Sequence, residues 1–208
     1  ETFREMGLGS FRDLLAEMAR DPAMLVWLAG RLNTRLRPQE NFGREIMELF
    51  TLGVGHYTEE DVYAAARVFT GWNLRVVGNP LDPAGYYEFV FVPNNHDPTA
   101  KTFTFPIYRD GSRTIPARAA SGGMQDGLDL INALATHPAT AERLARKLWN
   151  FFISEASAPD PDYLRGASGV YFANDTRIKP VVQYVLQSRW FQNPGTWHSR
   201  YAWPVEFA

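Results

Sequence analysis

Apolar residues recur every three to four positions along most of this chain, which is the spacing of amphipathic α-helices. The pattern predicts helices over about 11–18, 21–30, 39–52, 58–72, 124–134, 137–152, 161–173 and 175–186. The strongest end signals are Asp21 before Pro22, and Thr58 followed three residues later by Asp61. Residues 31–38, RLNTRLRP, form a basic loop between two of these helices.

The middle of the chain has a different pattern. Residues 86–92 are rich in β-forming side chains, and residues 101–105 alternate polar and aromatic side chains. Between them lies the turn-forming run Pro-Asn-Asn-His-Asp-Pro. We therefore expect a mainly α, multi-helix domain with a small inserted β-hairpin near residues 86–105.

This pattern predicts one domain over residues 1–208, with three parts. They are a helical half over 1–72, a loop and hairpin insertion over 73–120, and a second helical half over 121–208. The chain opens on a charged helical phrase and stops abruptly at WPVEFA. We expect it to be an internal segment of a longer protein.

Composition excludes several classes of protein. Lys and Arg total 21 against 23 Asp and Glu, so the basic excess of a broad nucleic-acid surface is absent. The sequence has no cysteine, which excludes disulfides and cysteine-ligated zinc or iron–sulfur centres. No apolar run reaches the roughly 18 residues of a membrane-spanning helix. We expect no nucleic-acid partner and no membrane span in this segment.

The helix predicted over 39–52 carries a cluster of charges. Glu40, Arg44 and Glu48 are four residues apart, so they align along one helix face. Glu45 and Glu48 lie one turn apart and are suited to hold a divalent cation such as Mg²⁺ or Ca²⁺. Two interpretations stay open, a salt-bridge brace between helices and a ligand or metal site.

His56 lies in a tight turn after two glycines. Glycine permits positive φ and lets the chain approach another element closely. One interpretation is a turn histidine that bonds to the backbone. The other is a metal ligand or general base beside Glu45 or Glu48.

His96, Asp97 and Lys101 form the most specific loop cluster. Asp97 precedes Pro98, which favours an extended or turn conformation and an Asx-turn. Alternatively, His96 and Asp97 bind a metal or move a proton in a cleft, and Lys101 presents positive charge to an anionic substrate. The sequence leaves both interpretations open.

Several phrases, taken together, resemble the domain of unknown function 1800 family. They are DPAML (21–25), ENFGREIMELFTLGVGHYTEEDV (40–62), AARVFTGW (65–72), HDPTAKTF (96–103), HPATAERLARKLWNFF (137–152) and WPVEF (203–207). The family's upstream Trp-His-x-His-Phe phrase is absent. Ala29 stands where the family more often has Asp. The resemblance implies an often exported bacterial protein without an established activity, and hence a periplasmic or extracellular location.

Two functions remain open at this point. The first is an exported helical scaffold or interaction domain with protein partners. The second is a metal-assisted hydrolase, in which a metal lowers the pKa of a bound water and a carboxylate acts as base. Its site would draw on Glu40, Glu45, Glu48, His56, His96 and Asp97.

Overall fold

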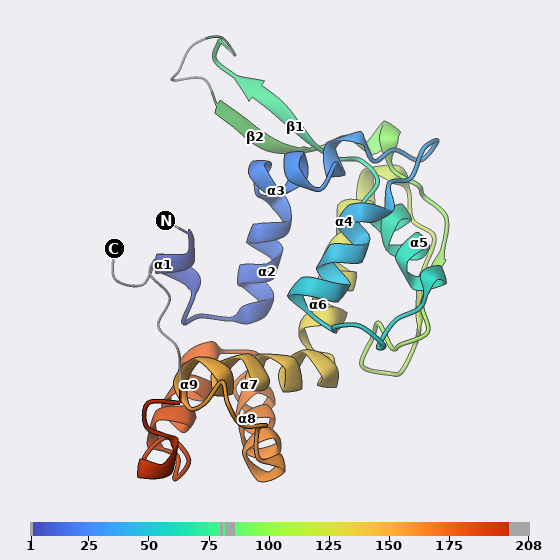
Figure 1. The fold of residues 1–208 in the computed structure, drawn as a ribbon. Helices are drawn as coiled ribbons and strands as arrows, with labels where there is room; N and C mark the ends of the chain where they lie inside the picture. Colours follow the sequence, from blue (N-terminus) through green and yellow to red (C-terminus); the bar gives the residue numbers. More distant parts are fainter. Residues whose placement is uncertain (1, 80, 82–85, 200–208) are drawn as a thin grey trace. The chain divides into compact units, whose positions relative to one another are not determined.

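The computed structural model describes residues 2–79, 81 and 86–199, so the phrase at 203–207 lies outside the described residues. The chain forms two compact units. The central unit is Arg12–Ala135, and the terminal unit joins Glu1–Phe11 to Thr136–Ala208. The described chain is mainly α with small antiparallel strand pairs, which confirms the predicted fold class (Figure 1).

Among the described residues, five helices contribute to the central unit, and two of them begin at the predicted caps Asp21 and Thr58. They are α2 (Phe11–Arg20), α3 (Pro22–Trp27), α4 (Glu40–Glu45), α5 (Glu59–Val68) and α6 (Met124–Ala135). The Asp21 carboxylate accepts the backbone N–H of Ala23 at 2.8 Å, which caps α3. Thr58 and Asp61 form the reciprocal capping box at the start of α5.

The helix expected to run regularly to residue 52 changes its winding after α4. Residues Ile46–Phe50 form a π-helical turn. Such a turn shifts backbone carbonyls away from their α-helical donors. The buried Thr51 hydroxyl donates to the carbonyl of Ile46 at 2.7 Å, so one of these acceptors is satisfied by a side chain.

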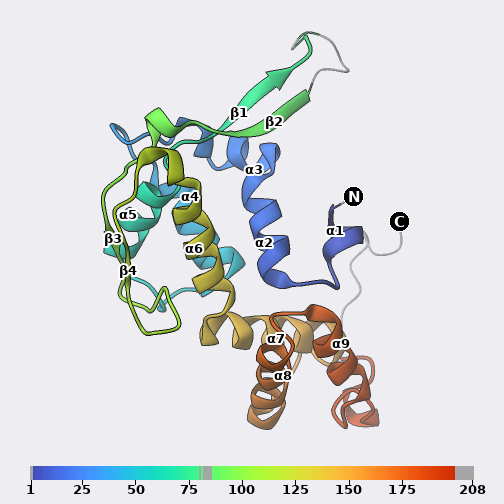
Figure 2. The ribbon, with the colours of Figure 1, turned by 180° about the vertical axis from the view of Figure 1, so that it is seen from behind.

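The β-hairpin is present, but its strands pair differently from the sequence prediction. Strand β2 (Tyr86–Phe91) pairs with β1 (Trp72–Val77), and β3 (Lys101–Thr102) pairs with β4 (Thr114–Ile115). Figure 2 shows β3 and β4 beside α5, on the other side of the unit from the β1–β2 hairpin. The buried Asp61 carboxylate explains the difference, because it accepts the backbone N–H of Thr104 at 2.7 Å. That bond holds the segment after β3 on α5, away from β2.

Aromatic rings fill the core of the central unit. Phe42, Phe69, Trp72 and Phe89 pack edge to face in a row, with ring centroids 4.9 to 5.2 Å apart. Gly127 of α6 lies against the Trp72 indole, where an added Cβ would be 2.3 Å from the ring. The glycine therefore lets α6 pack directly on the tryptophan.

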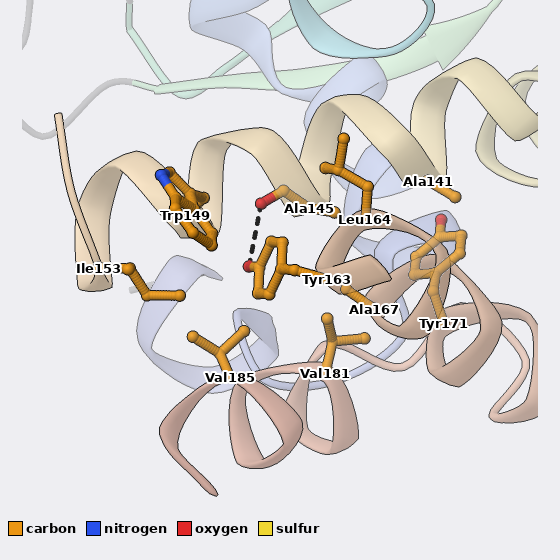
Figure 3. Packing of buried hydrophobic residues seen from close by; sticks show 10 residues of the cluster. All are labelled: Ala141, Ala145, Trp149, Ile153, Tyr163, Leu164, Ala167, Tyr171, Val181 and Val185. Atoms are coloured by element: carbon orange, nitrogen blue, oxygen red, sulfur yellow. Dashed lines mark hydrogen bonds between the residues drawn. The ribbon is translucent and has the colours of Figure 1, made fainter. Parts of the chain in front are cut away.

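The terminal unit contains four helices among its described residues. They are α1 (Thr2–Met6), α7 (Pro138–Phe152), α8 (Pro161–Ala173) and α9 (Ile178–Gln187). Its core surrounds Tyr163, whose hydroxyl donates to the Ala145 carbonyl at 3.1 Å (Figure 3). The helical half expected over 121–208 thus contributes α6 to the central unit and the other three helices to the terminal unit.

Candidate functional site

Three ionisable side chains meet inside the central unit. His96 follows a short 3₁₀ turn after β2, Lys101 begins β3, and Asp126 lies in the first turn of α6. All three side chains are 0% exposed. Burial of charged groups is costly unless they are paired and hydrogen-bonded, so their partners decide what this cluster does.

Asp126 is the centre of the cluster. Its Oδ2 accepts a hydrogen bond from Lys101 Nζ at 2.5 Å and lies 3.3 Å from His96 Nε2. Its Oδ1 accepts from Arg118 Nη1 at 3.0 Å. Lys101 also donates to the backbone carbonyl of Asp97. One carboxylate therefore joins the loop after β2, strand β3, the segment before α6 and α6 itself.

The pKa values of the ion pair reflect burial and these contacts. Burial alone raises the pKa of Asp126, but its contacts with His96 and Lys101 outweigh the effect of burial and leave that pKa below its usual value. Burial lowers the pKa of Lys101, and its contact with Asp126 opposes that change. Asp126 is thus held as a carboxylate by the donors around it.

His96 is fixed by both ring nitrogens. Its Nδ1 lies 2.8 Å from the carbonyl oxygen of Thr70, which only accepts, so Nδ1 carries a hydrogen. Its Nε2 lies 3.3 Å from Asp126 Oδ2 and 3.4 Å from Lys101 Nζ. The backbone at Gly123 covers the ring, since an added Cβ there would be 2.1 Å from His96 Cδ2.

A second carboxylate extends the network toward the surface. Asp129, one turn after Asp126, accepts from Arg118 and, at 2.6 Å, from the Tyr108 hydroxyl. Burial and the neighbouring Asp129 raise the pKa of Tyr108 to about 12. Arg118 therefore bridges two carboxylates of α6, and Tyr108 stays protonated as a donor at neutral pH.

Asp97 points to a different partner from His96, although the two are adjacent in sequence. Its Oδ2 accepts from Arg67 Nε of α5 at 2.8 Å, and its Oδ1 accepts the backbone N–H of Thr99 at 2.9 Å. The second bond is the predicted Asx-turn. Burial raises the pKa of Asp97, but hydrogen bonds from Arg67 and Thr99 dominate and lower it to about 2.

This pairing predicts an acid-dependent stability. Because the pKa of Asp97 is lower in the folded state than its ordinary 3.8, the stabilisation is complete above pH 4 and disappears as the pH falls through about 2. Asp97→Asn is expected to cost about 2 kcal/mol of unfolding free energy at pH 7. Urea unfolding of both proteins across this range measures the difference; a gap that stays constant with pH would contradict the ionic origin.

The charged helix face lies apart from this network. Arg44 Nη1 and Nη2 donate to the two carboxylate oxygens of Glu59 at 2.8 and 2.7 Å, and Nη2 contacts Glu40 at 3.3 Å. The hydrogen bond from Arg44 lowers the pKa of Glu59. Arg44 thus links α4 to the start of α5, in the arrangement expected of a brace between helices.

The remaining predicted residues have separate surroundings. Glu48 accepts a hydrogen bond from the Tyr57 hydroxyl, and burial together with this carboxylate raises the pKa of Tyr57 to about 12. His56 is exposed in its turn, and Glu45 is half-buried on α4. Among the described residues, no three histidine, aspartate or glutamate side chains are grouped so that they could hold a metal ion.

The structure therefore brings together His96, Lys101 and the backbone of Asp97, and separately Glu40 with Arg44. The groups that complete the cluster were not predicted from the sequence, namely Tyr108, Arg118, Asp126 and Asp129, and neither was Arg67, the partner of Asp97. The polar atoms of this cluster bond to one another, and its three central side chains are shielded from solvent.

Comparison with known proteins gives one match. A family model described as "Protein of unknown function (DUF1800)" matches residues 1–208. No curated protein and no solved structure matches the chain. Within the described residues, no helix combines the length and apolar character needed to cross a membrane.

Proposed function

This chain belongs to the DUF1800 family, and we propose that it serves as a helical scaffold or interaction domain of an exported assembly. The observation that carries the proposal is the closure of the buried network. Lys101, His96 and Asp126 are 0% exposed and bond to one another and to neighbouring segments. In this arrangement they are suited to fixing loops on α5 and α6, whereas a catalytic group must reach its substrate.

An exposed aromatic surface supplies the contact site. Trp27 at the end of α3 is 83% exposed, and Tyr86 and Tyr87 of β2 are about half exposed. With Pro22, Ala23 and Val26 they line a shallow groove between α3 and the hairpin. Aromatic side chains of this kind are enriched at protein interfaces, and the groove suits an apolar peptide segment of a partner protein. Export rests on the family resemblance.

Site-specific crosslinking tests this proposal. A photoreactive phenylalanine analogue placed at Trp27 or Tyr87 keeps an aromatic ring in the groove. In cells that produce the full-length protein, illumination is expected to give a discrete protein adduct at both positions. Tyr63 of α5, 51% exposed, is the matched control and is expected to give none. Fractionation of the same cells reports whether the protein is exported.

Two results would contradict the proposal. The first is crosslinking at Trp27 that is no stronger than at Tyr63. The second is a stoichiometric metal ion in the purified wild-type protein that is lost in Glu45→Ala. That second result would favour the metal-assisted hydrolase.

A further inference from the structure

The basic loop between α3 and α4 has a distinct charge pattern. Residues 22–39 contain Arg31, Arg35 and Arg37 but no acidic residue, although the whole chain has a formal net charge of −2. No ion pair connects these arginines to any other residue that the structure describes. All three are exposed. This stretch is therefore a local cationic surface on a weakly acidic protein.

The loop is anchored at its base. Asn33 is buried, and its side-chain amide donates to the Ala66 carbonyl of α5 at 2.7 Å, while its oxygen accepts the Gln39 N–H at 3.0 Å. Residues Thr34 and Arg37 form an antiparallel bridge that closes a tight turn. The Arg35 backbone N–H donates to the Asn95 carbonyl at 2.8 Å. The turn is therefore held in place by buried and backbone contacts.

Leucine and arginine alternate on this anchored loop. Leu36 lies between Arg35 and Arg37 at the tip of the turn and is 89% exposed; Leu32, beside Arg31, is 57% exposed. Each of these two exposed leucines is therefore flanked by arginine. Both views of the fold place α3 and the following loop along the edge from which the β1–β2 hairpin projects (Figures 1 and 2).

From this pattern we propose that the loop contacts the surface of an anionic lipid bilayer. Arginines at headgroup level are attracted by anionic phosphate groups, and their long side chains keep the charge there while the apolar stem lies deeper. Leu36 and Leu32 enter the boundary between headgroups and acyl chains. The absence of acids in the same stretch removes the repulsion that an anionic surface would otherwise meet.

A lipid surface fits these residues better than other polyanions. Nucleic acid offers phosphates but no apolar layer for the two leucines, and binding to it by a phosphate-tracking groove needs a larger basic surface than three arginines. An acidic protein segment would use the arginines and leave Leu36 in water. The combination of cationic and apolar side chains is the one that a bilayer boundary accommodates.

Vesicle sedimentation with the purified protein tests the proposal. Vesicles of equimolar phosphatidylcholine and phosphatidylglycerol are expected to bind the protein, and pure phosphatidylcholine vesicles are not. Arg35→Gln with Arg37→Gln should weaken binding about twenty-five-fold, because each arginine contributes about five-fold. Leu36→Ser should weaken it about ten-fold. Raised salt should weaken wild-type binding, because it screens the charges.

Matched controls come from the same unit. Arg109 and Arg113 are exposed and likewise flank a turn, and Leu81 on the hairpin is 90% exposed without neighbouring arginines. Arg109→Gln with Arg113→Gln, and Leu81→Ser, are expected to leave vesicle binding unchanged. None of these variants alters Trp27, Tyr86 or Tyr87, so the outcome is independent of the aromatic groove.

Several results would overturn the proposal. They are absence of binding to the anionic vesicles, equal binding to the neutral vesicles, and equal losses in the control variants. Release of the bound protein by inorganic phosphate would indicate a site for a free anion. Binding to polyglutamate that Leu36→Ser leaves intact, without vesicle binding, would indicate an acidic protein partner.

Discussion

Asp126→Asn is expected to lower the free energy of unfolding by about 3 to 5 kcal/mol, because it leaves a buried ammonium group without its counter-ion. Asp126 accepts hydrogen bonds from Lys101 and Arg118, and its side chain is 0% exposed. An asparagine side chain keeps the shape but carries no charge. In this variant Lys101 would still donate to the backbone carbonyl of Asp97. It would no longer contact a carboxylate at the centre of the cluster.

The matched control removes both charges. Lys101→Met combined with Asp126→Leu replaces the pair by apolar side chains of similar length, and such replacements of buried ion pairs are often neutral or stabilising. Arg118 keeps Asp129 as a partner in this variant. Urea unfolding followed by circular dichroism should therefore place the double variant well above Asp126→Asn. A double variant less stable than Asp126→Asn would contradict the explanation by unpaired charge.

Gly123→Ala is expected to cost about 3 kcal/mol, at the upper end of overpacking in a close-packed core. An added Cβ would be 2.1 Å from His96 Cδ2 and 2.4 Å from His96 Nε2. The imidazole has little room to move aside, because its Nδ1 is bonded to Thr70 and its Nε2 faces Asp126. The start of α6 must therefore shift, which weakens the contacts of Asp126.

Gly122→Ala provides the control for this substitution. No atom lies within 4 Å of a Cβ added at Gly122, and the residue is exposed. Its melting temperature should stay close to that of the wild type. An equal loss of stability in Gly122→Ala and Gly123→Ala would mean that the cost comes from the backbone of the turn. It would contradict the explanation by a steric clash with His96.

Much of the helical fold is predictable from local sequence. Helix positions follow from apolar spacing, and the ends at Asp21 and Thr58 follow from the bonds that their side chains make. The predicted pairing of residues 86–92 with residues 101–105 was wrong, because the position of the second segment depends on a residue far away in the sequence. Asp61 holds Thr104 on α5 across 43 positions, and no local pattern reports that bond.

The site was predicted only in part, and the missing part is tertiary. His96 and Lys101 stand out as charged residues in a loop, but Asp126 is 25 positions beyond Lys101 and reads as an ordinary first-turn acid. One signal was present in the sequence. Residues 101–107 alternate, with Phe103, Phe105 and Ile107 buried, so the same period places Lys101 on the buried side. A buried lysine requires an acidic partner, and in this fold that partner is Asp126.

Several charged residues of the central unit connect one element to another. Arg67 holds the Asp97 turn on α5, Arg44 joins α4 to α5, and Asp126 gathers three segments on α6. In each of these three contacts, a charged side chain reaches from one element to a neighbouring element. The aromatic groove and the cationic loop are the surfaces for which we propose contacts with other molecules.

Amine modification of the native protein tests the central claim most directly. The lysines of this sequence are Lys101, Lys147 and Lys179, and only Lys101 is buried. Reductive methylation followed by peptide mass spectrometry should modify Lys147 and Lys179 rapidly and leave Lys101 unmodified until the protein is unfolded. Modification of Lys101 in the folded protein at the rate of the other two would show an accessible amine, and would contradict the closed network.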